Sequence, residues 1–298
     1  MRVPRVSVVC CFFNEERFLV EAIESVLAQS LAELELILVD DGSTDRSRSI
    51  AERFAAADQR IVVVGHPGDG NRGLSASRNL GISVASAARI AFIDGDDRWP
   101  AEKLAEQVAI MDRHPEVSLL AGGARYWSSW AGGIDEVRQI GTVRDRVISP
   151  PDALLSTYPL GDAEAPGVTG FLVSAEAIAR IGGFEEAFPG MYEDQAFLAK
   201  MYLGEPVYFS SHCWFDYRQH DGSMLAAATR RGQYLDARGR FLDWFAHYIA
   251  EREVDDLVTQ RLRQARGDVR RALRRRTLSR VRSHLLTIAR APRRLALR

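Results

Sequence analysis

The segment RIAFIDGDD, residues 89–97, is the most informative part of the sequence about the fold. Its apolar run ends abruptly in three carboxylates, those of Asp94, Asp96 and Asp97. Carboxylates this close repel one another unless a positive charge lies between them. A strand that ends in such a cluster therefore predicts either a solvated turn that caps a helix or a turn that holds a cation.

Upstream of this stretch, short apolar segments alternate with helical patterns. The segments typical of strands are residues 6–13, 34–40, 61–64 and 89–94. Apolar residues at helical spacing occur in residues 15–29, 43–57 and 74–87. This alternation predicts an α/β fold with a parallel sheet that helices cover on both faces. Ligands of such sheets bind at the carboxyl ends of the strands.

Polar clusters follow three of these strands. Asn14-Glu15 follows the first, Asp40-Asp41 the second, and the acidic turn 94–97 the fourth. Gly95 allows a sharp turn and a close approach of a ligand to the backbone. Oxygen ligands suit Mg²⁺ or Mn²⁺, which keep positions open for substrate phosphates. Such an ion would neutralise charge on a leaving diphosphate.

Beyond Pro100 the alternation is less regular. We expect a helix over 101–114, a strand over 117–123, irregular structure over 121–167, a strand over 168–174, a helix over 191–203, short strands over 205–209 and 213–219, and helices over about 228–250 and 255–290. Tyr126, Trp127 and Trp130 lie in the irregular part, where aromatic rings either stack on a sugar or pack internally.

Composition limits the class of protein. The chain has 298 residues, of which 46% are hydrophobic and 27% charged, as in ordinary globular domains. Cys10, Cys11 and Cys213 build no disulfide framework, which favours a reducing compartment. The first residues do not follow the signal-peptide pattern, and no run of 18 apolar residues occurs. We therefore expect a cytoplasmic protein, with at most peripheral contact at the inner face of the membrane.

The net charge of −1 hides a strong asymmetry. Residues 250–298 carry 15 Arg against 5 Asp or Glu, so this tail is basic and the remaining chain acidic. Within residues 269–289 of this tail, apolar residues recur at helical spacing with Arg between them: Val269, Leu273, Leu278, Val281, Leu285 and Ile288. This pattern indicates either a helix on a membrane surface or a helix that docks on the acidic body. No motif supports binding to nucleic acid.

Four motifs in order give the chain a family resemblance. They are SVVCCFFNEERFLVEAIESVLAQ (7–29), ELILVDDGSTDRS (35–47), GLSASRNLGISVASAARIAFIDGDD (73–97) and YEDQ (192–195). The series resembles the inverting family 2 glycosyltransferases with the glycosyltransferase A fold, over roughly residues 5–220. The resemblance implies one Rossmann-like nucleotide-binding domain with a mixed central sheet, plus a C-terminal helical extension. We expect a donor-binding half at 1–120, an acceptor-binding half at 121–227, and the Arg-rich extension at 228–298.

The resemblance also implies roles for individual residues. Donor-binding residues would be Phe13, Asn14, Glu15, Asp41 (which reads the base), Arg78 (at the ribose or phosphates), Asp94 and Gly95. Metal ligands for Mn²⁺ or Mg²⁺ would be Asp94, Asp96 and His220. His220 is alternatively a locally bonded loop residue, in which case Arg218 supplies the cation that faces the phosphates. Asp97 would support the turn or cap a helix.

The catalytic base implied by the resemblance is Asp194, and Glu193 would help to bind the acceptor. A carboxylate can remove the acceptor's proton as the new bond forms. We expect the neighbouring Glu193 to raise the pKa of Asp194. Without the other motifs, the same pair would be two acids that stabilise a helix N-terminus.

Two departures from the family pattern refine the prediction. The Gln-x-x-Arg-Trp motif of processive members is absent, and Gln195-Ala196-Phe197 stands where many single-transfer members have Trp. The predicted function is therefore a non-processive transfer of one sugar, with a UDP-sugar as the expected donor, to a hydroxyl of a glycan or lipid-linked glycan. A non-catalytic nucleotide- or glycan-binding protein and a sugar-nucleotide pyrophosphorylase are the alternatives. The second needs a Gly-rich loop after the first strand, and CFFNEE has no glycine.

Overall fold

The structure, a computed structural model, describes residues 3–68, 70–222 and 232–290. The chain divides into two compact units, Met1–Ala227 and Ala228–Arg298. One sheet passes through the whole first unit. The division of that unit at residue 120 into donor and acceptor halves therefore stays a prediction.

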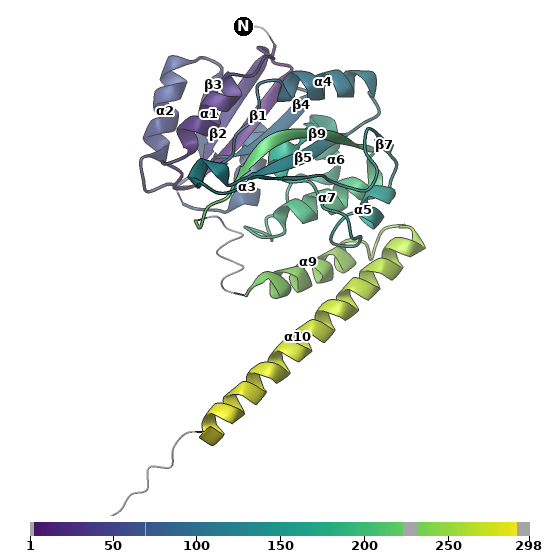
Figure 1. Ribbon diagram of the computed structural model, residues 1–298. Helices are drawn as coiled ribbons and strands as arrows, with labels where there is room; N and C mark the ends of the chain where they lie inside the picture. The colour runs from purple at the N-terminus through teal and green to yellow at the C-terminus, as the bar shows by residue number, and fades with distance from the viewer. Residues whose placement is uncertain (1–2, 69, 223–231, 291–298) are drawn as a thin grey trace, which may run out of the picture. The chain divides into compact units, whose positions relative to one another are not determined.

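Within the described ranges, nine strands form one mixed sheet (Figure 1). Four parallel strands lie in the order β3-β2-β1-β4: β3 (Ile61–Gly65), β2 (Leu34–Asp40), β1 (Val6–Phe12) and β4 (Arg89–Asp94). The order continues with β8 (Leu172–Ser174), β5 (Leu119–Trp127), β9 (Val207–Arg218) and β7 (Arg146–Ile148), while β6 (Glu136–Arg138) pairs with β5. Because β8 runs antiparallel to both β4 and β5, the predicted mixed sheet is confirmed.

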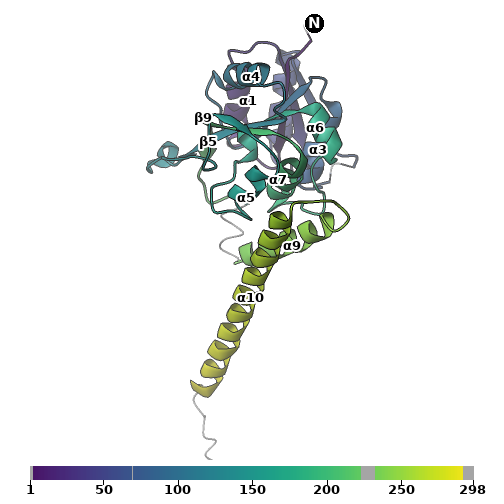
Figure 2. The same cartoon turned by 90° about the vertical axis from the view of Figure 1, so that its right-hand side faces the viewer.

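Helices cover both faces of the sheet, as the alternation predicts. The helices of the first unit are α1 (Leu19–Leu27), α2 (Ser47–Ala57), α3 (Leu74–Val84), α4 (Lys103–Arg113), α5 (Asp152–Ser156), α6 (Ala175–Ile181) and α7 (Glu193–Gly204). Figure 2 shows α1 and α4 on one face and α3 and α6 on the other. Of the strands between them, β1 and β2 are almost fully buried, which explains why their sequences are mostly apolar.

Two helices begin later than their patterns predict, because the preceding residues form turns at the functional edge of the sheet. Before α1, the backbone carbonyl of Glu15 accepts from the N–H groups of Phe18 and Leu19. Before α2, the carboxylate of Asp45 accepts from the N–H of Ser47 at 2.9 Å. Asp45 thus satisfies a helical donor that would otherwise have no partner.

The two short strands expected at 205–219 are one strand, β9. Ser210, Ser211 and His212 form a bulge in it, where its register against β5 shifts. The Ser210 hydroxyl accepts from the N–H of His212 and so closes the bulge. On β5, a Cβ at Gly122 would lie 2.6 Å from the carbonyl oxygen of His212, so only glycine fits there. The polar run that looked like a loop is therefore a bulge.

The second unit contains α9 (Tyr234–Tyr248) and α10 (Asp256–Arg290). The buried positions of α10 within its described side chains include Val258, Leu262, Ala265 and Val269. Val269 and Leu273 lie against Gly239 of α9. The side chains at the remaining predicted positions, 278, 281, 285 and 288, lie outside the part that the structure describes, so the apolar row beyond Leu273 stays a prediction.

None of the described helices is both long enough and apolar enough to cross a membrane.

Candidate active site

The predicted polar clusters meet at the carboxyl edge of the parallel strands. In the register of the sheet, Phe12 at the end of β1 pairs with Asp40, and Cys11 pairs with Asp94. The loops that follow these three strands therefore begin side by side. This confirms the prediction that the clusters share one edge.

The loop after β1 is held to the loop before α2. Asn14 has a left-handed backbone (φ 57°), and its side-chain carbonyl accepts from the N–H of Thr44 at 2.8 Å. The N–H of Glu15 donates to the hydroxyl of Ser47 at 2.8 Å. Phe13 is 43% exposed at this edge, so its ring is available to a ligand. Asn14 thus shapes the loop through its side chain, which sequence alone did not indicate.

Asp41 is buried and holds the loop that leads into α3. Its two carboxylate oxygens accept from the backbone N–H groups of Arg72 (2.7 Å) and Gly73 (3.0 Å). His66, which the sequence analysis did not single out, lies beside it: its Nε2 is 3.6 Å from Asp41 Oδ1 and 2.9 Å from the Ser77 hydroxyl. The available signal was that His66 directly follows β3, at the same edge.

Arg78 joins the acidic turn to the candidate catalytic pair. Its guanidinium, 2% exposed, contacts Asp94 at 2.8 Å and Glu193 at 3.0 Å. Burial alone would lower the pKa of Arg78, but the charges of Asp94 and Glu193 raise it well above its usual value. Arg78 is therefore a permanent cation between two carboxylates.

The acidic turn directs its carboxylates to different partners. Asp97 is buried, accepting from the backbone N–H of Arg218 (3.0 Å) and from the hydroxyl of Thr169 (2.8 Å). Burial, followed by the charges of Asp96 and Asp94, raises the pKa of Asp97. The structure therefore gives Asp97 a position that supports the turn, not one that binds a ligand. Asp96 instead faces His220, with 2.9 Å between its Oδ2 and the ring Nε2.

Gly95, within this turn, lies close to Glu15. A Cβ at Gly95 would be 3.0 Å from the Cβ of Phe12 and 3.4 Å from the Cγ of Glu15, so the turn passes close to the first loop. Burial, followed by the charges of Asp96 and Asp94, raises the pKa of Glu15 to about 8. The cluster therefore favours a neutral Glu15 at pH 7 when no cation is present.

Of the three predicted metal ligands, the structure brings Asp96 and His220 into contact. A carboxylate and an imidazole are a donor set that suits Mn²⁺. Asp94 pairs with Arg78 instead, and the described part of the chain contains no group of three or more His, Cys, Asp or Glu placed to hold a metal. The residues fit an open site in which Asp96 and His220 would hold the ion and leave positions for substrate phosphates and water, not a closed protein cage.

Glu193 and Asp194 begin α7, directly after Tyr192, whose backbone is left-handed (φ 73°). Asp194 is partly exposed, and its oxygens accept from the backbone N–H (2.7 Å) and side-chain amide (3.2 Å) of Gln195. Burial is the main cause that raises the pKa of Asp194. We expected Glu193 to raise the pKa of Asp194. The effect runs the other way: burial, followed by the charge of Asp194, raises the pKa of Glu193.

Tyr126 and Trp127 end β5 instead of lying in irregular structure, while Trp130 follows that strand, and all three rings make internal contacts. The ring of Trp127 is buried, with the guanidinium of Arg218 at 4.3 Å from its centre. The indole N–H of Trp130 donates to the carbonyl of Gln219 at 3.1 Å. Tyr126 packs edge-on against Tyr217. These contacts correspond to the packing alternative.

Sequence and structural comparisons bear on the family. The model for "Glycosyl transferase family 2" matches residues 7–155. The chain is 30% identical over 223 residues to the putative teichuronic acid biosynthesis glycosyltransferase TuaG of Bacillus subtilis, covering 74% of this chain and 81% of TuaG. The chain belongs to glycosyl transferase family 2.

Another relative matches a shorter segment. The uncharacterized glycosyltransferase EpsJ of B. subtilis is 47% identical over 95 residues, which are 32% of this chain and 27% of EpsJ. The chain thus spans about a quarter of that relative.

Solved structures agree with the glycosyltransferase A type of fold. S. aureus TarS 1–349 in complex with UDP-GlcNAc superposes with a TM-score of 0.67 at 19% identity, over 89% of this chain and 71% of that one. The mannosyltransferase PcManGT from Pyrobaculum calidifontis, in complex with GDP-Man and Mn²⁺, gives 0.61 at 18% identity, over 97% and 80%. The predicted family and fold are confirmed.

The Arg78 bridge generates a prediction about stability. Arg78→Met leaves Asp94 and Glu193 without their shared cation, and breaking a buried pair typically costs about 3–5 kcal/mol. Because the Asp94 side chain is 33% exposed, we expect a loss at the lower end of that range in urea unfolding. The double variant Arg78→Met with Glu193→Gln should recover part of the stability that Arg78→Met loses, since it leaves one unpaired charge fewer. An unchanged urea midpoint for Arg78→Met would contradict the bridge.

Proposed function

We propose that this family 2 protein is an inverting, non-processive glycosyltransferase. It would move one sugar from a UDP-sugar to a hydroxyl of a glycan or lipid-linked glycan, during assembly of a surface or secreted glycan. The observation that carries the proposal is the bridge through Arg78, since one buried cation joins the acidic turn at Asp94 to Glu193, the neighbour of Asp194. Donor-side and acceptor-side carboxylates are thereby held in one site.

The donor is proposed to lie along the carboxyl edge of the parallel strands. Phe13 is exposed there, and Asp41 with His66 forms the polar wall at the end of β2 and β3. TarS, of similar fold, has been solved with UDP and with UDP-GlcNAc, which supports a uridine nucleotide. TuaG and its putative role in teichuronic acid biosynthesis support a surface polysaccharide as the product.

Asp194 is the proposed catalytic base. Gln195 donates two hydrogen bonds to its carboxylate and so fixes the orientation of the oxygens. The carboxylate would take the proton of the acceptor hydroxyl, on the side of the sugar opposite the leaving group. Glu193, bound to Arg78, would contact the acceptor and keep the first turn of α7 against the acidic turn. A bound Mn²⁺ or Mg²⁺, held by Asp96 and His220 beside Asp94, would neutralise the leaving diphosphate.

The donor class is tested by thermal unfolding of the full chain with UDP, GDP, ADP or CMP, each with and without Mn²⁺. A ligand at 100 times its dissociation constant stabilises the folded state by about 2.7 kcal/mol. We expect a Mn²⁺-dependent shift with UDP that the other nucleotides do not match. A shift with GDP alone would replace the donor class, and no shift with any nucleotide would favour a non-catalytic glycan-binding protein.

Replacing the proposed base separates the enzyme from a binding protein. Asp194→Asn should lower kcat by at least about 100-fold, because general base catalysis contributes that much, while UDP binding stays unchanged. In the wild type, kcat/KM should decrease as the pH falls and the base becomes protonated. Because burial raises the pKa of Asp194, this decrease should begin at a higher pH than it would for an ordinary aspartate. Glu193→Gln, the matched control, retains the base, and we expect it chiefly to raise the KM for the acceptor. Equal turnover in Asp194→Asn and wild type would exclude this base.

We also propose that α10 contacts an anionic membrane surface, on the cytoplasmic side. Arg263, Arg270 and Arg274 are exposed and form one row along the helix. At the same spacing, the row continues through positions 278, 281, 285 and 288, which carry Leu, Val, Leu and Ile. No Asp or Glu follows Asp268 in the printed sequence, so no carboxylate offsets the arginines there. A row that combines Arg with apolar residues is typical of helices at a lipid surface.

Vesicle flotation of the full chain tests this contact. We expect binding to an equal mixture of phosphatidylcholine and phosphatidylglycerol, and none to phosphatidylcholine alone. The double variant Arg270→Glu with Arg274→Glu should lose most of the binding. The control variant, Arg261→Glu with Arg275→Glu, makes the same change of charge outside the row and should retain more of the binding. Absence of wild-type binding, or equal loss in both variants, would contradict the proposed row.

A further inference from the structure

Arg218 is a buried cation next to the acidic turn that the proposed chemistry does not use. It is the last residue of β9, 2% exposed, and precedes His220 by two residues. Its guanidinium contacts Glu21 of α1 at 2.6 Å, and its Nε donates to the backbone carbonyl of Asp96 at 2.6 Å. The expectation that Arg218 faces the donor phosphates therefore does not match its partners.

Two hydrogen bonds from Arg218 converge on consecutive residues of the turn. The side chain binds the carbonyl of Asp96, while the backbone N–H binds the carboxylate of Asp97. Residues 96 and 218 are 122 positions apart in the chain, so these bonds join the turn to the end of a distant strand. The ring of His220 then meets the carboxylate of Asp96. The geometry of that pair depends on the same connection.

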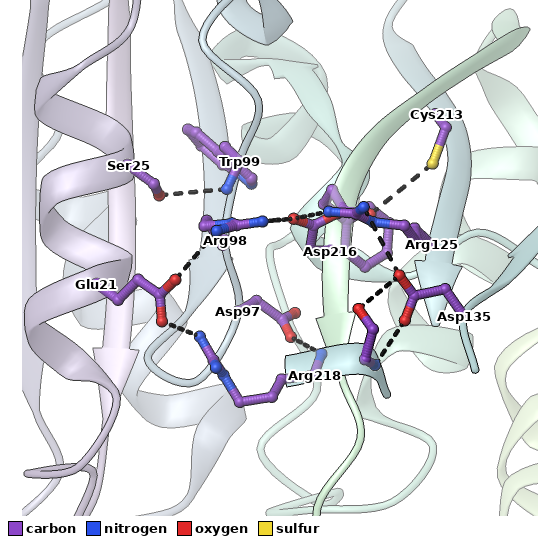
Figure 3. A network of polar contacts seen from close by, with 12 residues as sticks. Glu21, Ser25, Asp97, Arg98, Trp99, Arg125, Asp135, Cys213, Asp216 and Arg218 are labelled. Atoms are coloured by element: carbon purple, nitrogen blue, oxygen red, sulfur yellow. Dashed lines mark hydrogen bonds and ion pairs between the residues drawn. The ribbon is translucent and has the colours of Figure 1, made fainter. Parts of the chain in front are cut away.

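Glu21 is the carboxylate that neutralises this buried guanidinium. It also binds Arg98 at 3.2 Å, and Arg98 and Arg125 share Asp216 (Figure 3). The ring centre of Phe18 lies 4.7 Å from the Arg218 guanidinium, which restricts its position further. A buried guanidinium with an ion pair and an aromatic neighbour is held in one orientation.

We propose that Arg218, held by Glu21, is a positioning residue that fixes the turn 94–97 against His220 and so prepares the site for a metal-bound nucleoside diphosphate. The turn itself is short and carries mutually repelling carboxylates, so it needs a support from outside. The ligand class rests on the proposed function; the positioning of the turn does not.

A matched pair of variants on α1 tests the support. Glu21 and Glu24 both line an open pocket of about 660 Å³, but Glu24 is exposed and makes no contact with Arg218. In the protein without ligand, Glu21→Ala should speed amide hydrogen exchange at residues 96–98 by about tenfold or more, the effect of losing one hydrogen bond to a charged group. Glu24→Ala should leave this exchange unchanged. Equal exchange in the two variants overturns the proposal.

A second measurement asks whether the positioning serves the ligand. We expect Glu21→Ala to raise the dissociation constant of UDP with Mn²⁺ by about tenfold, and to leave that of UDP without metal unchanged. Glu21→Gln, which keeps an acceptor oxygen, should restore most of the affinity. Equal loss with and without Mn²⁺ would mean a merely structural role and overturns the proposal. If wild-type protein bound no nucleotide, the proposed function would fail, while the exchange result would still decide the role of Arg218.

Discussion

The rest of the site depends on the ion pairs of one buried guanidinium, that of Arg78. Carboxylates gather at the edge where the parallel strands end, and such a cluster is unfavourable without a cation. Arg78 lies on α3, between Asp94 on one side and Glu193 on the other, and it is almost wholly shielded from water. The helix that carries the proposed base is thereby attached to the turn proposed to bind the donor.

A second cation contacts the same turn. Arg218 reaches it from the end of β9, and Glu21 neutralises Arg218 from α1. Asp96 retains His220 as its partner, and Asp94 remains partly exposed. Cations from distant parts of the chain thus hold a short acidic turn in one conformation while leaving it open to a ligand.

Several features of the fold and site could be predicted from local sequence. Strand and helix alternation predicted the parallel half of the sheet, and the polar residues after each strand predicted its functional edge. Less local features could not be predicted. His66 is recognised as part of the site only because the fold places it beside Asp41. The polar run 210–212 is a bulge because Gly122 of another strand makes room for it. Such contacts join residues far apart in the chain and leave no periodic signal.

Hydrophobic spacing and short motifs were enough to predict the family, the order of strands and helices in the first hundred residues, and the residue types at the sheet edge. The pairing of those residues depends on the folded chain: Asp94 with Arg78, Asp96 with His220, and Asp97 with Thr169. The sequence alone does not distinguish the three carboxylates of this turn. Their environments differ because the fold brings a different distant residue to each, and because Asp97 is buried while Asp94 is partly exposed.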